Sequence, residues 1–307
     1  LLRHYQGLYA VLDELRRRTR RNRLTAGLFF TDDDFGSDLD YTTELLTAMA
    51  DAALPVKWIA QTSIGIARNE ALLDLARRSG CSSLFLGLES ITRESLLEAN
   101  KKNRPSEYAE LVARIHDAGI GVEGAFVFGF DTDGPEAFDN TVDFADEIGV
   151  DLGFFSVLTP LPGTGTFSRL WEQGRIFDVD WSHYSLLQTT FEPARMSAAE
   201  LDDGVLRAFR RFYETRRRAR RLRRHLRQLP PDFAVVLALV GRGIGREYRR
   251  NRTGADRAPY VAHPEDLERL AVTSAAPASE AIWLAADQVD GGPGAVTVPV
   301  ALAPRPS

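Results

Sequence analysis

Five short apolar segments, separated by helical patterns, set the strongest limit on how this chain can fold. They begin about 30 residues apart and lie at residues 26–31, 56–63, 80–90, 121–130 and 150–157. The first of them, AGLFFT, lacks the polar–apolar alternation of a half-exposed strand, and such a run suits a strand covered on both faces. Strands that alternate with helices in this way predict a right-handed β/α series around a parallel sheet.

Polar residues follow every one of these predicted strands. They are Asp32 to Asp34, Gln61 to Ser63, Glu89 with Ser90, Asp131, and Thr159. Parallel strands bring their carboxyl ends to one edge of a sheet, which is where ligands bind in β/α barrels and doubly wound folds. The sequence therefore predicts a ligand site at this edge.

The third strand segment, GCSSLFLGLES at residues 80–90, contains two residues that invite a functional interpretation. Glu89 ends the strand, where its carboxylate either points into the ligand site or caps the following helix. Cys81 begins the strand, opposite the polar edge, so we expect a small buried apolar residue rather than a nucleophile. Glu89 is the stronger site candidate because the neighbouring strand ends are also polar.

The acidic run Asp32, Asp33 and Asp34 has three readings. Hard carboxylate oxygens can bind a divalent cation, as in a metal-dependent β/α hydrolase, or accept hydrogen bonds from the amino group of a ligand. Aspartate is also common in exposed turns between a strand and a helix. We favour a site because other polar strand ends converge on the same edge.

Glycines in the fourth strand and prolines after the fifth give weaker signals. Gly124 and Gly129, with Phe126 between them, suit the close approach of a flat ligand to the backbone, although simple helix–strand packing also explains them. The loop that begins with Thr159 and Pro160 is either a rigid rim of the site or a stiff connector. No histidine has metal-ligand spacing, and His183, within DWSHY, is a weak site candidate.

We divide the chain into a β/α part (1–195), a helical extension (196–252) and a weakly folded tail (253–307). A helix is expected over residues 1–21, and Ser197 and Glu200 form a capping box that opens a later helix. The segment 216–227 holds eight arginines. It can bind phosphates or an anionic membrane surface, but a solvated helix face is the simplest interpretation.

The amino-acid composition limits the cellular compartment and the classes of binding partner that we expect for this chain. One cysteine excludes an internal disulfide framework and fits a reducing compartment, so we expect a cytoplasmic protein. No apolar run is long enough to span a bilayer. The net charge of −5 gives no general indication of nucleic-acid binding, and a small-molecule substrate fits the predicted site better.

Several stretches, taken together, resemble the C-terminal part of a radical S-adenosylmethionine (SAM) protein of the cobalamin-binding-domain type. They span residues 24–213 and include FFTDDDF, LFLGLESI, the Asn100–Lys101 pair, IHDAGIGVEGAFVFGFDTD, FSVLTPLPGTGTF and FEPARMSAAEL. The resemblance implies a partial (β/α)6 barrel that lacks its first strand, with SAM lying across the strand ends.

The resemblance also assigns a role to each strand end. Asp32 to Asp34 stand where the family contacts the methionyl amino group of SAM, and Gln61 and Ser63 end the next strand. Glu89 stands at the ribose position, residues 124–129 at the adenine position, and residues 159–164 in the loop after the last strand. It implies a radical SAM enzyme, methyltransferase-like or related, that acts on a small molecule.

The cofactor set departs from the family pattern. The family ligates a [4Fe–4S] cluster through C-x3-C-x2-C, whereas this chain has one cysteine and it lies elsewhere, so the cluster thiolates are not in this chain. Cobalamin would come through an N-terminal domain, which we expect as a missing part or as a separate partner chain. Two interpretations stay open: a fragment that is inactive alone, or a noncatalytic SAM-binding protein with a degenerate barrel.

Overall fold

The fold is built on five parallel strands in the order in which they occur along the chain. The computed structural model describes residues 26–53, 56–229 and 231–250. Its sheet has the order β1-β2-β3-β4-β5, and every neighbouring pair is parallel. The strands are β1 (Ala26–Phe30), β2 (Val56–Thr62), β3 (Cys81–Glu89), β4 (Gly121–Phe128) and β5 (Leu152–Val157). The predicted α/β architecture is therefore confirmed.

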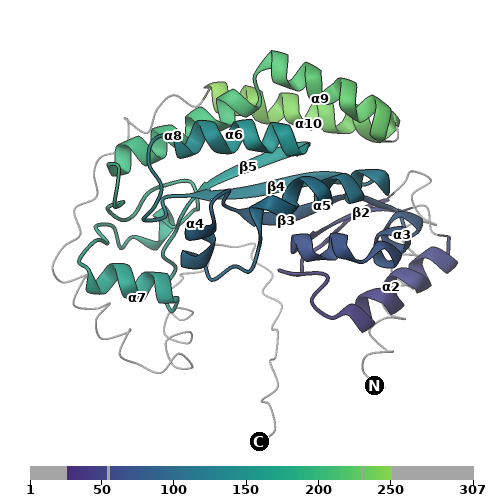
Figure 1. Cartoon of the computed structure of the whole chain (residues 1–307), viewed down its shortest axis with the longest axis horizontal. Coiled ribbons are helices and arrows are strands. Elements are labelled where there is room, and N and C mark those ends of the chain that lie inside the picture. The colour runs from purple at the N-terminus through teal and green to yellow at the C-terminus, as the bar shows by residue number, and fades with distance from the viewer. Residues whose placement is uncertain (1–25, 54–55, 230, 251–307) are drawn as a thin grey trace, which may run out of the picture.

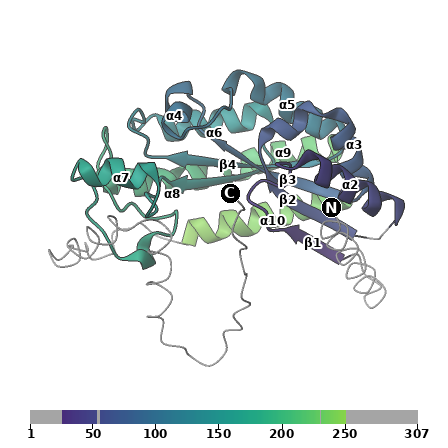
Figure 2. The ribbon, with the colours of Figure 1, turned by 90° about the horizontal axis from the view of Figure 1, so that it is seen from below.

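Helices connect the strands and extend the fold beyond β5, as Figure 1 shows. They are α2 (Leu39–Asp51), the 3-10 turn η1 (Ile64–Arg68), α3 (Glu70–Arg78), α4 (Arg93–Glu98), α5 (Pro105–Asp117), α6 (Ala137–Ile148), α7 (Gly165–Glu172), the 3-10 turn η2 (Trp181–His183), α8 (Ala198–Phe212), α9 (Thr215–Gln228) and α10 (Pro231–Arg250). Figure 2 shows α3, α5 and α6 on one side of the strands. We call the opposite side of the sheet the inner face.

Side-chain caps explain where several helices begin. Asp38, Asn69 and Thr92 each accept a hydrogen bond from a backbone N–H in the first turn of α2, α3 and α4. The predicted capping box is confirmed, because Ser197 and Glu200 satisfy each other's backbone N–H groups at the start of α8.

A proline lies at or just before two further helix starts. α5 begins at Pro105, whose missing N–H costs nothing in a first turn. Pro135 lies in a turn closed by the bond from the Ala137 N–H to the Gly134 carbonyl, and α6 begins at Ala137.

The core lies between the sheet and the helices on its outer side. Trp58 of β2 is fully buried and its indole N–H donates to the Ser79 hydroxyl at 3.1 Å. Phe128 packs against Phe138 of α6, with ring centroids 4.7 Å apart, while Phe155 meets Phe209 of α8 edge to face. Aromatic rings of this size bury the largest areas and contribute most to core stability.

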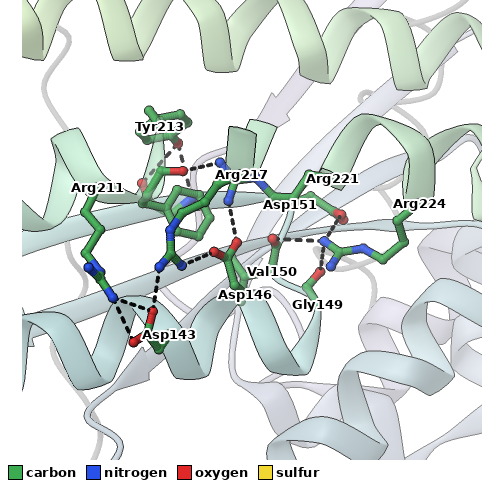
Figure 3. A network of polar contacts seen from close by, with 12 residues as sticks. Asp143, Asp146, Gly149, Val150, Asp151, Arg211, Tyr213, Arg217, Arg221 and Arg224 are labelled. Carbon is green, nitrogen blue, oxygen red and sulfur yellow. Dashed lines mark hydrogen bonds and ion pairs between the residues drawn. The ribbon is translucent and has the colours of Figure 1, made fainter. Parts of the chain in front are cut away.

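The helical extension is fixed to β5 and α6 by polar contacts as well as by packing. The Tyr213 hydroxyl bonds to both the N–H and the carbonyl of Gly153, each at 3.1 Å. Figure 3 shows arginines of α8 and α9 pairing with aspartates of α6 and of the α6–β5 turn. Arg221 is buried and its charge is paired with Asp146. Residues 196–250 therefore pack on the β/α part rather than forming a separate lobe.

No helix within the described ranges is both long enough and apolar enough to cross a membrane. The helix predicted over residues 1–21 and the tail from residue 253 lie outside those ranges.

The first strand lies at the edge of the sheet and predicts low solubility. Among the described residues β1 pairs only with β2, and the Phe29 side chain is 58% exposed. Exposed apolar strand edges recruit other chains. We expect Phe29→Lys to raise the soluble fraction after expression, measured by gel filtration. A stable, monomeric unmodified chain would contradict this prediction.

Candidate functional site

Glu89 occupies a strained and well-fixed position at the end of β3. Its φ is +63°, in the left-handed region that non-glycine residues rarely adopt, and the β3–β4 register shifts between Gly87 and Glu89. Such strain costs about 1–3 kcal/mol and persists where the surroundings enforce it. The conformation therefore supports a role for Glu89 beyond packing.

Three residues after β3 hold this conformation in place. Asn103 donates to the Gly87 carbonyl at 2.9 Å, and the Tyr108 hydroxyl donates to the Leu88 carbonyl at 2.7 Å. Lys101 Nζ lies 3.0 Å from Glu89 Oε1. Burial raises the pKa of Tyr108 far above its ordinary value, so this hydroxyl stays a donor. Sequence reasoning missed Asn103 and Tyr108 and gave Lys101 no role, although the Asn100–Lys101 pair was a signal.

The Glu89 carboxylate folds back over Gly87 on the inner face. A Cβ atom on Gly87 would lie 2.7 Å from Glu89 Oε1, so a side chain at this position would displace the carboxylate. The Glu89 side chain is 18% exposed. One of its oxygens faces Lys101, and the carboxylate remains accessible at the edge formed by the carboxyl ends of the strands.

The acidic run is bound to the end of β2. Asp34 Oδ1 accepts from the Thr62 hydroxyl and from the Ser63 N–H, both at 3.0 Å. Gln61 Nε2 donates to the Asp33 carbonyl at 3.1 Å. The structure thus brings the predicted residues of the first two strand ends together. Asp34 is engaged with β2, whereas Asp32 and Asp33 expose their carboxylates.

Within the described part of the chain, which includes the acidic run, no group of three or more His, Cys, Asp or Glu side chains is arranged to hold a metal ion. The interpretation of Asp32 to Asp34 as part of a metal-dependent hydrolase stays a hypothesis.

Gly124 and Phe126 have their side-chain positions on the outer side of the sheet. Phe126 is fully buried and stacks on Phe155 with centroids 5.9 Å apart. A Cβ on Gly124 would lie 3.1 Å from Leu88 and Val150 side-chain atoms. Only the backbone of these two residues can contact a ligand on the inner face. Close packing against Leu88 and Val150 is enough to explain a glycine at position 124.

Gly129 and the loop after β5 border the same edge. Gly129 has φ +105° and its N–H donates to the Asp133 carboxylate at 3.0 Å. The Thr159 hydroxyl donates to the Val157 carbonyl at 3.1 Å, and Pro160 is buried. These contacts stiffen the turns after β4 and β5, which fits the predicted rim.

The inner face of β3, β4 and β5 carries residues that the sequence prediction left out. Side chains alternate along a strand, so Glu123, Ala125 and Val127 lie opposite Phe126. The Phe85 and Phe154 rings from the flanking strands lie 5.1 Å apart, both partly exposed. Within β4 the same alternation could have placed Ala125 and Val127 opposite Phe126, but the register shift after Gly87 hides how they lie relative to Glu89.

One carboxylate lies deeper on this face. Glu123 accepts a hydrogen bond from the Ser83 hydroxyl at 2.5 Å. Burial raises its pKa, against the opposing effect of that hydrogen bond. The inner face thus combines an aromatic surface with two carboxylates, Glu123 near the start of β4 and Glu89 at the end of β3.

An ion-pair network fixes the rim between β4 and α7. Arg169 pairs with both Glu98 and Asp131, and Arg175 lies 2.8 Å from Asp131. Burial opposes ionisation of Asp131, but the hydrogen bond and charge of Arg175, with the charge of Arg169, hold its pKa below the ordinary value. The network ties α4, the loop after β4 and α7 together at the carboxyl-end edge.

His183 and Cys81 have separate places. His183 Nδ1 lies 2.7 Å from the buried Asp178 carboxylate, near the loop that follows α7. Cys81 begins β3, at the end of the strand opposite Glu89, and burial raises the pKa of its thiol. The expectation of a buried cysteine at the strand entrance is confirmed.

Comparison with known proteins places these features in a family context. Residues 7–145 match the family model described as the radical SAM superfamily. Bacteriochlorophyllide d C-12(1)-methyltransferase of Chlorobaculum tepidum is 33% identical over 68% of this chain and 46% of the relative. Anaerobic magnesium-protoporphyrin IX monomethyl ester cyclase of Cereibacter sphaeroides is 31% identical over 52% of this chain and 26% of the relative. The chain spans less than half the length of these curated relatives.

One solved structure is similar over nearly the whole chain. The cobalamin-dependent S-adenosylmethionine radical enzyme OxsB, with aqua-cobalamin bound, aligns with a TM-score of 0.50 over 92% of this chain and 50% of OxsB. At 10% sequence identity this likeness concerns the fold alone.

Proposed function

Because the chain belongs to the radical SAM superfamily, whose enzymes use SAM and a [4Fe–4S] cluster, we propose that it is the SAM-binding barrel of an enzyme that transforms a small molecule. The observation that carries the proposal is the fixed, strained carboxylate of Glu89 at the carboxyl-end edge. Ligands of parallel β/α folds bind at this edge.

The described residues suit SAM in chemical terms. Glu89 can accept hydrogen bonds from the two ribose hydroxyls, and the exposed Asp32 and Asp33 can accept them from the methionyl ammonium group. The small Ala125 and the backbone of β4 give the flat adenine a surface on the inner face. Thr159 and Pro160 border it. These roles are proposals that rest on the placement of each residue.

The residues of this chain do not fit the cluster. A [4Fe–4S] cluster needs several thiolates, and the single cysteine, Cys81, is buried at the opposite end of β3 with a raised pKa. We therefore derive no cleavage of SAM from this chain. We propose that it is inactive alone and that cluster ligands, and a cobalamin domain if one takes part, belong to another part or chain.

Methyl transfer is the proposed reaction class. Two curated relatives are a methyltransferase and a cyclase of chlorophyll-type precursors, which favours a small, largely apolar substrate. The partly exposed Phe85 and Phe154 on the inner face suit such a molecule. We also propose a cytoplasmic location, which the single free cysteine supports.

A noncatalytic SAM-binding protein is the second candidate. The absence of cluster thiolates from this chain favours it, whereas the family match favours the enzyme. The two candidates share the SAM site and differ in whether a partner supplies the cluster.

Calorimetric titration of SAM into the purified chain tests the proposal. We expect one SAM bound per chain, and no SAM cleavage after incubation with iron, sulfide and a reductant. Absence of binding heat, confirmed by equilibrium dialysis, would remove the SAM site. Cleavage of SAM by the chain alone would overturn the proposed inactivity.

A further inference from the structure

Seven of the eight arginines of α9 fall into two sets on different faces of the helix, and Arg218 belongs to neither. Arg217, Arg221 and Arg224 point toward α6 and β5, where aspartates and backbone carbonyls accept their hydrogen bonds (Figure 3). A second set is exposed, and we call it the arginine stripe: Arg216, Arg220, Arg223 and Arg227. Its spacings of four, three and four residues place all of it along one line of the helix.

The arginine stripe has no counter-charge among the residues that the structure describes. Across residues 26–53, 56–229 and 231–250, none of its four guanidinium groups makes an ion pair, and α9 contains no acidic residue. Like charges three and four residues apart destabilise a helix. Asp143, Asp146 and Asp151 offset this repulsion for the inward arginines. No described residue does so for the stripe, and an external anion would supply the missing charge.

Three members of the stripe line a surface hollow, together with Arg224 of the inward set. Its lining is Arg220, Arg223, Arg224, Arg227 and Gln228, and its volume is about 470 Å³. The lining supplies several N–H donors and no carboxylate. Forked guanidinium donors match phosphate oxygens particularly well.

Apolar side chains accompany the stripe. Leu226 of α9 is 53% exposed, and on α10, which packs beside α9, Leu239 is 61% exposed and Val240 43%. Nucleic acid would engage the guanidinium groups but would leave these side chains in water. A phospholipid surface offers phosphates to the arginines and hydrocarbon to the leucines.

We propose that the α9–α10 surface binds the protein to an anionic phospholipid membrane, with the arginine stripe on the lipid phosphates and Leu226 and Leu239 in the interface. The chain carries a net charge of −5, so most of its surface is not attracted to such a membrane. Contact through the stripe alone would fix which side of the protein faces the lipid. The inference is independent of the SAM site.

Vesicle co-sedimentation of the purified full chain tests this surface. We expect sedimentation with vesicles of phosphatidylcholine and phosphatidylglycerol, little with phosphatidylcholine alone, and release at high salt because screening weakens exposed charges. The triple change Arg220→Gln, Arg223→Gln and Arg227→Gln should weaken binding of the protein to anionic vesicles on the order of 100-fold. Each arginine near the membrane surface contributes about a fivefold effect. Glutamine keeps a good helix former at each position.

A matched control removes the same charge elsewhere. Arg77→Gln, Arg78→Gln and Arg114→Gln change three arginines on α3 and α5, and this variant should sediment like the unmodified chain. The double change Leu226→Ser and Leu239→Ser should reduce binding to anionic vesicles even at low salt, because it removes apolar contacts and leaves the charges in place. Circular dichroism establishes that each variant is folded.

Three outcomes would overturn the proposal. They are equal sedimentation with neutral and anionic vesicles, undiminished binding of a folded stripe variant, and an equal loss in the control variant. Binding to heparin or duplex RNA without binding to vesicles would replace the membrane with a soluble polyanion.

Discussion

Replacing Glu89 with alanine is expected to weaken SAM binding by the chain at least tenfold, up to complete loss of measurable heat. A carboxylate that accepts two ribose hydroxyls contributes hydrogen bonds to a charged group, each about 1.5–3 kcal/mol. Calorimetric titration of SAM into the two proteins measures the difference. Glu110→Ala serves as a control, because Glu110 pairs with Arg114 on the surface of α5, and it should leave binding unchanged.

Glu89→Gly separates binding from folding. At φ +63° glycine avoids the strain of a side chain, about 1 kcal/mol, so this variant should be at least as stable as Glu89→Ala. It should nevertheless bind SAM as weakly as the alanine variant. Undiminished SAM binding by either variant would exclude Glu89 from the site and leave its strain unexplained.

Removing the charge of Asp151 is expected to give a large loss of stability. Asp151 is fully buried, and four groups converge on its carboxylate: His116 Nε2 at 2.9 Å, His225 Nε2 at 2.7 Å, the Val122 N–H at 2.8 Å and Arg224 Nη2 at 3.2 Å. Asp151→Asn keeps the shape of the side chain but removes the carboxylate charge that these four groups share. We expect a loss of about 3–5 kcal/mol in the free energy of unfolding, measured in urea.

The pH dependence gives this prediction a second readout. Burial opposes ionisation of Asp151, but His116 and His225 hold its pKa well below the ordinary value. A carboxyl group whose pKa is lower in the folded protein than in the unfolded chain stabilises the fold at pH above its unfolded pKa, which is about 3.9 for aspartate. This stability is lost as the pH falls from that value toward the folded pKa. The unmodified protein should therefore lose stability below about pH 4, and Asp151→Asn should lose less over that range.

Asp143→Asn is the matched control for Asp151. The Asp143 side chain is 54% exposed and pairs with Arg211 and Arg217 on the surface, so its loss should cost less than about 1 kcal/mol. Equal losses for the two variants would show that burial of the charge does not matter. A change below 1 kcal/mol for Asp151→Asn would contradict the prediction outright.

Much of the fold could be predicted from local pattern. Apolar runs at regular spacing specified five parallel strands, because a β/α series has few alternatives once each strand must be covered. The capping box at Ser197 was also predicted, since it depends on residues within one turn. Parallel pairing then brought the polar strand ends to one edge.

The orientation of site residues could not be read so directly. Gly124 and Phe126 were selected by composition, yet their side-chain positions face the helices, and Ala125 and Val127 take the inner face. A shift of one residue in strand register moves every side chain to the other face of the sheet. The face on which a site residue lies is therefore known only once its neighbours in the sheet are known. The bulge at Gly87 adds a further change that no alternation rule anticipates.

By itself, the sequence determined the strand series, the common polar edge and the absence of cluster thiolates from this chain, because these follow from residue type and near-neighbour spacing. Only the tertiary structure decided that Lys101, Asn103 and Tyr108 hold Glu89 in a strained conformation. It also decided which arginines of α9 pair inward and which remain outside. Both depend on contacts between segments distant in sequence, where burial and counter-charge select among side chains that look alike in the sequence.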